Sequence, residues 1–219
     1  MDIIWEGMTR SETLGDTLAN ARLKPANAAR VYNWAHVVAI LIEHPEFVNA
    51  TRPGGRSLSA PLYQAAHGGV SVEVVQHLLD LGAWRTLQNA RGERPVDVAK
   101  RMSQTHLLSV LEPEYKRHVP FGVLLKIQSH FHAVIRERAA RLIEAHVLRL
   151  PELEPLLEMQ RTKIWFPIPG RAGGFSYWLE EAGVEAKLIA DSWCRVVDGS
   201  GQRHEITSAG SQMVDEGFV

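Results

Sequence analysis

Two segments of the chain align with each other at a fixed distance. Ala60-Pro61-Leu62-Tyr63 corresponds to Arg94-Pro95-Val96-Asp97, and the two prolines are 34 residues apart. Proline is favoured at the first position of a helix because its missing N–H would have no intrahelical partner there. A helix start repeated at this spacing predicts a stack of short helical hairpins, each of which buries its apolar face against its neighbours.

The stretch after the first proline has the pattern of a complete hairpin. Leu62 and Ala65 fall at helical spacing, and the glycines of 67–69 indicate a tight turn, because glycine adopts backbone angles that other residues resist. A second apolar helix follows over 74–81 and is ended by a glycine. An extended finger over 83–92 then leads to the next helix.

Matching segments lie on either side of this hairpin. Residues 37–43 repeat the apolar pattern of 74–81, and residues 107–111 repeat it again. We therefore expect about three two-helix units within 20–113, since a stack of this kind needs several units to bury a continuous core. An extra helix over 13–23 is expected before them.

These features resemble the ankyrin-repeat family over a little under half of the chain. The threonine and histidine of the family's Thr-Pro-Leu-His motif are replaced by Ala60 and Tyr63, and then by Arg94 and Asp97. The hydrogen bond that those two side chains normally share is therefore not expected here. The layout, ankyrin-like units followed by a separate tail domain, is also similar to uncharacterised bacterial ankyrin proteins. This resemblance implies a binding surface and no known activity.

After the helical units the period of the sequence changes twice. Apolar residues recur every three or four positions over 120–150, which predicts one long amphipathic helix. We expect this helix to cover the exposed apolar end of the last repeat, and it is also a candidate for the core on which one face of the sheet packs. The period then becomes two, which is typical of strands. The expected strands are 162–169, 175–180, 186–197, 202–207 and a short edge over 214–219, with turns at 169–174 and 198–201.

The sequence as a whole predicts an α+β protein. Its expected parts are a short ankyrin-repeat helical stack of about three repeats, a long helix and a small antiparallel β-sheet. We expect domains at 1–118 for the repeats with an N-terminal capping helix, at 119–158 for the connecting or capping helix, and at 159–219 for the sheet.

Composition excludes several classes of partner. The formal net charge is −1, and the part after residue 118 holds 11 basic against 13 acidic residues, so neither nucleic acid nor an anionic membrane is an expected partner. This balance also disfavours a third hypothesis, single-stranded nucleic acid on the aromatic sheet. Cys194 is the single cysteine, which excludes an internal disulfide. Without a signal peptide or an apolar stretch of about 20 residues, we expect a cytoplasmic protein.

Motifs for catalysis, cofactors and metals are not found in the sequence. The glycine-rich segment 169–174 lacks the lysine and hydroxyl of a phosphate-binding loop, and His204-Glu205 is not followed by the second histidine of the helical zinc motif. One alternative stays open, in which the C-terminal sheet is a small catalytic or toxin-like module that the repeats target. Arg195, Arg203, His204 and Glu205 would then form an acid–base group, although cross-strand charge pairing explains the same residues.

Non-catalytic binding of a protein partner is the expected function. Ankyrin stacks present their fingers and first helices as a concave surface, and Trp, Tyr and Arg often dominate interface energies. The partner is expected to carry an acidic segment, because arginines gather on these elements while acidic residues are scarce. The residues expected to bind it are Arg52, Arg56, Tyr63, His67, Trp84, Arg85, Gln88, Arg91 and Arg94.

Overall fold

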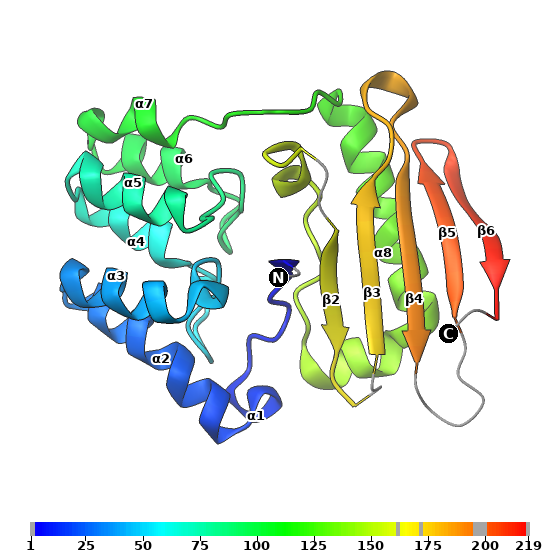
Figure 1. Cartoon of the computed structure of the whole chain (residues 1–219), viewed down its shortest axis with the longest axis horizontal. Helices are drawn as coiled ribbons and strands as arrows, with labels where there is room; N and C mark the ends of the chain where they lie inside the picture. Colours follow the sequence, from blue (N-terminus) through cyan, green and yellow to red (C-terminus); the bar gives the residue numbers. More distant parts are fainter. Residues whose placement is uncertain (1–2, 161–162, 171–172, 195–200, 218–219) are drawn as a thin grey trace. The chain divides into compact units, whose positions relative to one another are not determined.

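The computed structural model describes residues 3–160, 163–170, 173–194 and 201–217, and within them it contains eight α-helices and a six-stranded mixed sheet (Figure 1). The predicted α+β class is confirmed. The chain divides into two compact units. The helical unit is Met8–Glu114, and the sheet unit combines Met1–Gly7 with Tyr115–Val219.

The N-terminal segment belongs to the sheet unit, whereas the sequence analysis assigned it to a helical domain over 1–118. β1 (Ile3–Ile4) pairs in parallel with β2 (Ile164–Ile168). Trp5 is buried beside it, and its indole N–H donates to the carbonyl of Arg149 at 2.9 Å. A two-residue strand shows no period of its own, so pattern analysis could not detect this long-range pairing.

The helical unit consists of successive pairs of helices. α2 packs on α3, α4 packs on both α5 and α6, and α6 packs on α7. The helices of this unit are α1 (Ser11–Leu14), α2 (Asp16–Arg30), α3 (Trp34–Glu43), α4 (Pro61–Gly68), α5 (Val72–Asp80), α6 (Pro95–Arg101) and α7 (Leu108–Leu111), with short 3-10 turns at η1 (Pro45–Phe47) and η2 (Thr105–Leu107).

The two aligned prolines both begin helices, as predicted. Pro61 is the first residue of α4 and Pro95 is the first residue of α6. The C-cap of α4 is Gly69, whose φ of 62° lies in the left-handed region that glycine adopts without steric cost. Ala65 on α4 and Ala99 on α6 are fully buried. Their small side chains let the two helices pack closely, because the distance between helix axes depends on the side chains at the contact.

The first long helix extends further than the sequence indicated. A helix was expected over 13–23, but α2 continues to Arg30 through Pro25. Proline inside a helix removes one backbone hydrogen bond, and the alanines at 26, 28 and 29 have the high helix propensity that favours continuation. The helix stops before Tyr32, which has a left-handed φ of 57°. This longer helix carries Ala26, Ala29 and Arg30 of the candidate site described below.

The sheet has the strand order β1-β2-β3-β4-β5-β6. All pairs from β2 onward are antiparallel, as predicted, and the parallel β1 makes the sheet mixed instead of purely antiparallel. The remaining strands are β3 (Gly173–Leu179), β4 (Leu188–Cys194), β5 (Gln202–Thr207) and β6 (Gly210–Glu216), and short 3-10 turns lie at η3 (Glu154–Leu157) and η4 (Gly183–Glu185).

Strand ends differ from prediction mainly at the last hairpin. Only Ser208 and Ala209 separate β5 from β6, so the edge strand begins at Gly210 and not at 214. Neither residue is a strong turn former, which explains why the turn was not predicted. Parts of two expected turns, residues 171–172 and 198–200, lie outside the described residues, as do residues 195–197 of the expected strand over 186–197.

The long helix α8 (Phe121–His146) covers one face of the sheet. It contacts β2, β5 and β6, and it lies behind the strands in Figure 1. It was expected to cover the last repeat as a separate segment over 119–158, with the core of the sheet as the other role considered, and its contacts with the strands agree with that other role. Its apolar face forms the core of the sheet unit, since Phe131 contacts Phe175 and Tyr177 of β3. Among the described residues, no helix is long and apolar enough to cross a membrane.

Candidate functional site

Two of the residues predicted to bind a partner are part of the helical core. Trp84 is only 6% exposed, and its backbone N–H donates to Asn49 Oδ1 at 2.9 Å. The Asn49 amide in turn donates to the Gly82 carbonyl at 2.9 Å. The Asn49 side chain thus links the segment that follows η1 to the segment that begins the finger over 83–92. Tyr63 is 2% exposed, and its hydroxyl donates to the carbonyl of Leu87. The indole of Trp84 packs inside the helical unit, which disfavours it as an anchor for a partner.

Arg85 and Arg94, two more of the predicted residues, make contacts within the helical unit. Arg85 Nε donates to the carbonyl of Val110 at 2.9 Å, and its guanidinium also contacts Glu114 at 3.4 Å. The backbone N–H of Arg94 donates to Asp97 at 2.9 Å, so the Asp97 carboxylate satisfies a backbone N–H at the start of α6. Gln88 is half-buried, whereas Arg56 and Arg91 are exposed.

A cavity of about 350 Å³ lies in the helical unit between α2, the loop after Arg52, α4 and α6. Of the nine predicted residues, it brings together Arg52, Tyr63 and His67. The sequence analysis missed Arg30 at the end of α2, and also Tyr32, Gln64 and Arg101. Every described residue that lines the cavity is neutral or basic, with none of the lining positions held by Asp or Glu. The cavity is therefore suited to an anionic group.

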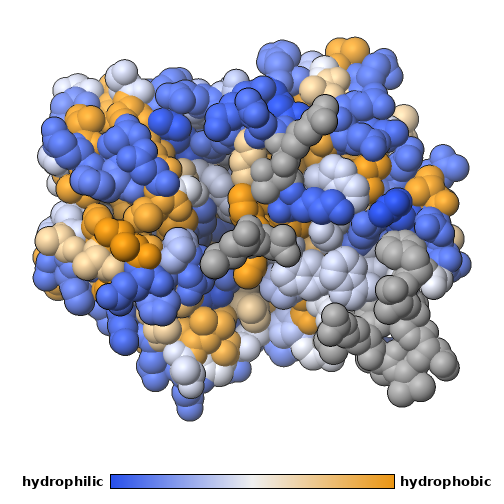
Figure 2. Space-filling view, in the orientation of Figure 1, coloured by the Kyte–Doolittle hydropathy of each residue, from blue (hydrophilic) through white to orange (hydrophobic). Residues whose placement is uncertain are grey.

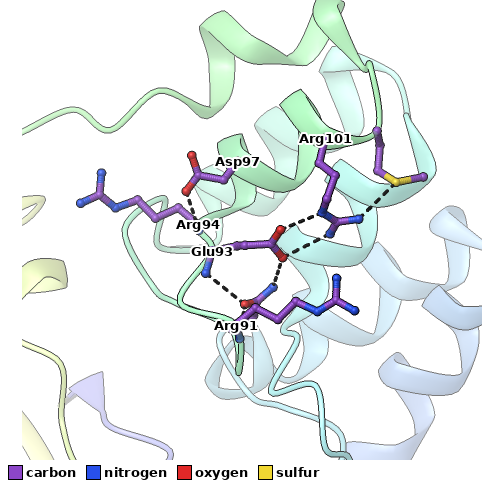
Figure 3. A network of polar contacts seen from close by, with 7 residues as sticks. Arg91, Glu93, Arg94, Asp97 and Arg101 are labelled. Atoms are coloured by element: carbon purple, nitrogen blue, oxygen red, sulfur yellow. Dashed lines mark hydrogen bonds and ion pairs between the residues drawn. The ribbon is translucent and has the colours of Figure 1, made fainter.

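One of the lining arginines is already neutralised. Arg101 Nε donates to Glu93 Oε1 at 2.7 Å, its terminal nitrogen donates to Oε2 at 3.2 Å, and the amide of Asn89 donates to Oε2 at 3.0 Å (Figure 3). The hydrogen bonds from Arg101 and then from Asn89 lower the pKa of Glu93 to about 2. Glu93 thus stays ionised and balances Arg101, which leaves the charges of Arg30 and Arg52 for the cavity.

Removing this carboxylate is expected to change how stability depends on pH. The folded-state pKa of Glu93 is about 2, below its unfolded value of about 4.3. The contribution of this carboxylate to the free energy of unfolding is therefore complete above a pH of about 4.3 and is lost as the pH falls toward about 2. Glu93→Gln should lower the free energy of unfolding by about 1 kcal/mol or less at neutral pH, because the pair is partly exposed. The difference from the wild type should vanish near pH 2, as measured by urea unfolding at several pH values. Glu43→Gln, an exposed change outside the network, is the control, and an unchanged difference at low pH would contradict the assignment.

A tyrosine and a histidine form one wall of the cavity. The Tyr32 hydroxyl lies 3.5 Å from His67 Nδ1, and the Tyr32 ring lies over Gly68. A Cβ at Gly68 would come within 2.3 Å of the Tyr32 ring, so this ring position requires glycine. The glycine was the only sequence signal for this contact, and the analysis assigned it to a turn.

The alternative acid–base group does not assemble. Strand alternation places Arg203 and Glu205 on one face of β5 and buried His204 on the other. Arg203 donates to both oxygens of Asp191 at 2.7 and 2.9 Å, and Glu205 lies 3.4 Å from Lys187. Arg195 lies outside the described residues. Burial lowers the pKa of His204, but its partners in the hypothesis lie across the strand.

Tryptophans on the open face of the sheet pack on each other and on cations. Trp165 and Trp193 stack with centroids 4.7 Å apart, and Lys163 Nζ lies 4.0 Å above the Trp178 ring. Gly174 lies beside this stack, where a Cβ would meet the Trp165 ring at 2.9 Å. Figure 2 shows pale surface with strongly hydrophilic blue side chains over this face. These contacts are cross-strand pairs of the kind that stabilise sheets.

The chain matches no protein-family model, and no curated protein matches it. In the part of the chain that the structure describes, no group of three or more His, Cys, Asp or Glu side chains is placed to hold a metal ion.

Proposed function

We propose that the helical unit is a short ankyrin-type stack of about three repeats that binds a protein partner without catalysis. Three features support this proposal. Two helices begin at prolines 34 residues apart, each long finger precedes such a helix, and Asn49 joins successive fingers by hydrogen bonds to Gly82 and Trp84. A stack of this kind places its variable side chains on one concave surface.

The observation that carries the proposal is the cavity with two uncompensated arginines. Arg30 and Arg52 come from different elements, and each can donate two parallel hydrogen bonds to one anion. The exposed ring of Tyr32 supplies an apolar wall. We propose that an acidic segment of the partner enters here, with arginine–anion pairs in place of the tryptophan anchor expected from the sequence.

The compartment and the chemical class of the partner are inferred from composition. A single cysteine suits a reducing compartment, so we place this binding in the cytoplasm. The near-neutral net charge of −1 favours a protein over nucleic acid or an anionic membrane.

Removing both cavity arginines is expected to abolish partner capture. Arg30→Ala/Arg52→Ala should weaken binding of a fluorescein-labelled oligoglutamate peptide by roughly tenfold or more, because hydrogen bonds to charged groups contribute about 1.5–3 kcal/mol each. The same variant of the full chain should lose, in affinity capture with quantitative mass spectrometry, a set of proteins that carry acidic segments. Thermal unfolding should be almost unchanged, since Arg30 is exposed and Arg52 half-buried.

The chain offers a closely matched control. Lys24→Ala/Lys100→Ala removes the same charge from α2 and α6, but neither residue lines the cavity and neither was among the residues expected to bind the partner. Equal losses for the two double variants would show bulk electrostatic attraction and refute a specific site. Binding that survives in the cavity variant would place the partner elsewhere.

A further inference from the structure

Two arginines that line the cavity form no salt bridge with any residue that the structure describes. Arg30 is the last residue of α2, and Arg52 lies in the loop before α4. Among the described residues, neither forms a salt bridge, whereas Arg101 is held by both oxygens of Glu93. The partial negative charge at the C-terminal end of α2 favours Arg30 but amounts to only about half a charge. The cavity thus presents close to two positive charges.

This charge matches a phosphate better than a carboxylate. A carboxylate carries one negative charge and two oxygens, whereas a phosphate monoester carries about −1.5 to −2 at neutral pH and three strong acceptor oxygens. The planar guanidinium groups of two arginines supply enough parallel N–H donors to engage those three oxygens, and arginine–phosphate pairs are commonly bidentate. Lysine would act only as a point charge. We propose that the anion bound between Arg30 and Arg52 is a phosphate monoester carried on a peptide side chain.

The neutral lining fits the group that would carry the phosphate. A volume of about 350 Å³ exceeds what a phosphate alone fills, and the exposed ring of Tyr32 leaves apolar surface for the side chain that carries the phosphate. Ser57 and Ser59 add hydroxyl donors near Arg52. The peptide origin rests on the proposed function, because the cavity would recognise the phosphate of a free metabolite through the same two arginines.

Fluorescence polarisation with matched peptides tests the inference on the full chain. The probes are a short acidic peptide whose central residue is phosphotyrosine, phosphoserine, tyrosine or glutamate, with free phosphotyrosine and inorganic phosphate as competitors. Of the two phosphorylated peptides, the one that binds more tightly should bind roughly tenfold tighter than the glutamate peptide. The second negative charge and the third oxygen of the phosphate should engage the second arginine. Arg30→Ala/Arg52→Ala should remove this preference, and Lys24→Ala/Lys100→Ala should keep it.

A charge-conserving variant distinguishes bidentate hydrogen bonding by the guanidinium groups from electrostatic attraction alone. Arg30→Lys/Arg52→Lys keeps both charges but loses the planar forks, so it should lose most of the preference for phosphate while still binding acidic peptides. Preference that persists undiminished in this variant would overturn the bidentate geometry and, with it, the inference.

The other outcomes distinguish this inference from the function on which it rests. Equal affinity for the phosphorylated and glutamate peptides would refute phosphate selection and leave the acidic-segment proposal standing. Free phosphotyrosine or inorganic phosphate competing as strongly as the phosphopeptide would support phosphate recognition and refute a peptide partner. Failure of every probe to bind would overturn both.

Discussion

Trp84→Ala is expected to destabilise the helical unit by about 3–5 kcal/mol, because truncating a buried aromatic removes its transfer free energy and leaves a cavity that neighbours fill only in part. The indole is 6% exposed and adjoins the finger contact of Asn49. A loss of this size is a large fraction of the stability of a typical domain. Chemical unfolding should show it as a lower midpoint, and hydrogen exchange should show faster opening across the helical unit.

An exposed residue of the same unit is the control for this change. Ile42 on α3 is 63% exposed, and Ile42→Ala should alter the free energy of unfolding by no more than about 0.5 kcal/mol. The comparison also decides between the two roles considered for Trp84. An indole that leaves stability intact when removed, yet weakens partner capture, would be an interface anchor and would contradict the buried position described above.

Trp84 and Arg30 illustrate what the sequence could reveal about the site. Finger residues of a repeat can face the partner or the next repeat, and composition does not distinguish the two directions for a tryptophan. Arg30 escaped attention because α2 was expected to end near residue 23, so its last turn was not recognised as a cavity wall. The predicted residues were selected by finger position, whereas the cavity is lined by residues of α2, α4 and α6 and of the loop before α4.

Local signals predicted the elements better than their partners. Pro61 and Pro95 fix helix starts through chemistry within a few residues, and alternation fixed the antiparallel strands in the same way. The position of β1 and the packing of α8 depend on contacts between distant parts of the chain. An amphipathic pattern predicts that one face of a helix is buried but does not identify the element that packs against that face. This explains why α8 was assigned to the repeats and was found on the sheet.

Phe131→Ala is the second change expected to have a large effect, and it tests the core between α8 and the sheet. Phe131 is fully buried, and its ring lies 6.2 Å from Phe175 in an edge-on arrangement and 5.0 Å from Tyr177. We expect the free energy of unfolding to fall by about 3–5 kcal/mol, because the substitution leaves a cavity in the core. Loss of the two aromatic contacts places the value toward the upper end of this range. Hydrogen exchange should report faster opening of α8 and β3, with the helical unit protected as in the wild type.

The matched control lies on the opposite side of the same helix. Leu125 is 46% exposed, so Leu125→Ala removes a large apolar side chain from α8 without opening a cavity and should cost no more than about 0.5 kcal/mol. Similar losses for the two variants would mean that the Phe131 face is not the one buried on the sheet. Loss of protection in α4 and α6 after Phe131→Ala would instead couple the helix to the repeats, as the sequence alone had suggested.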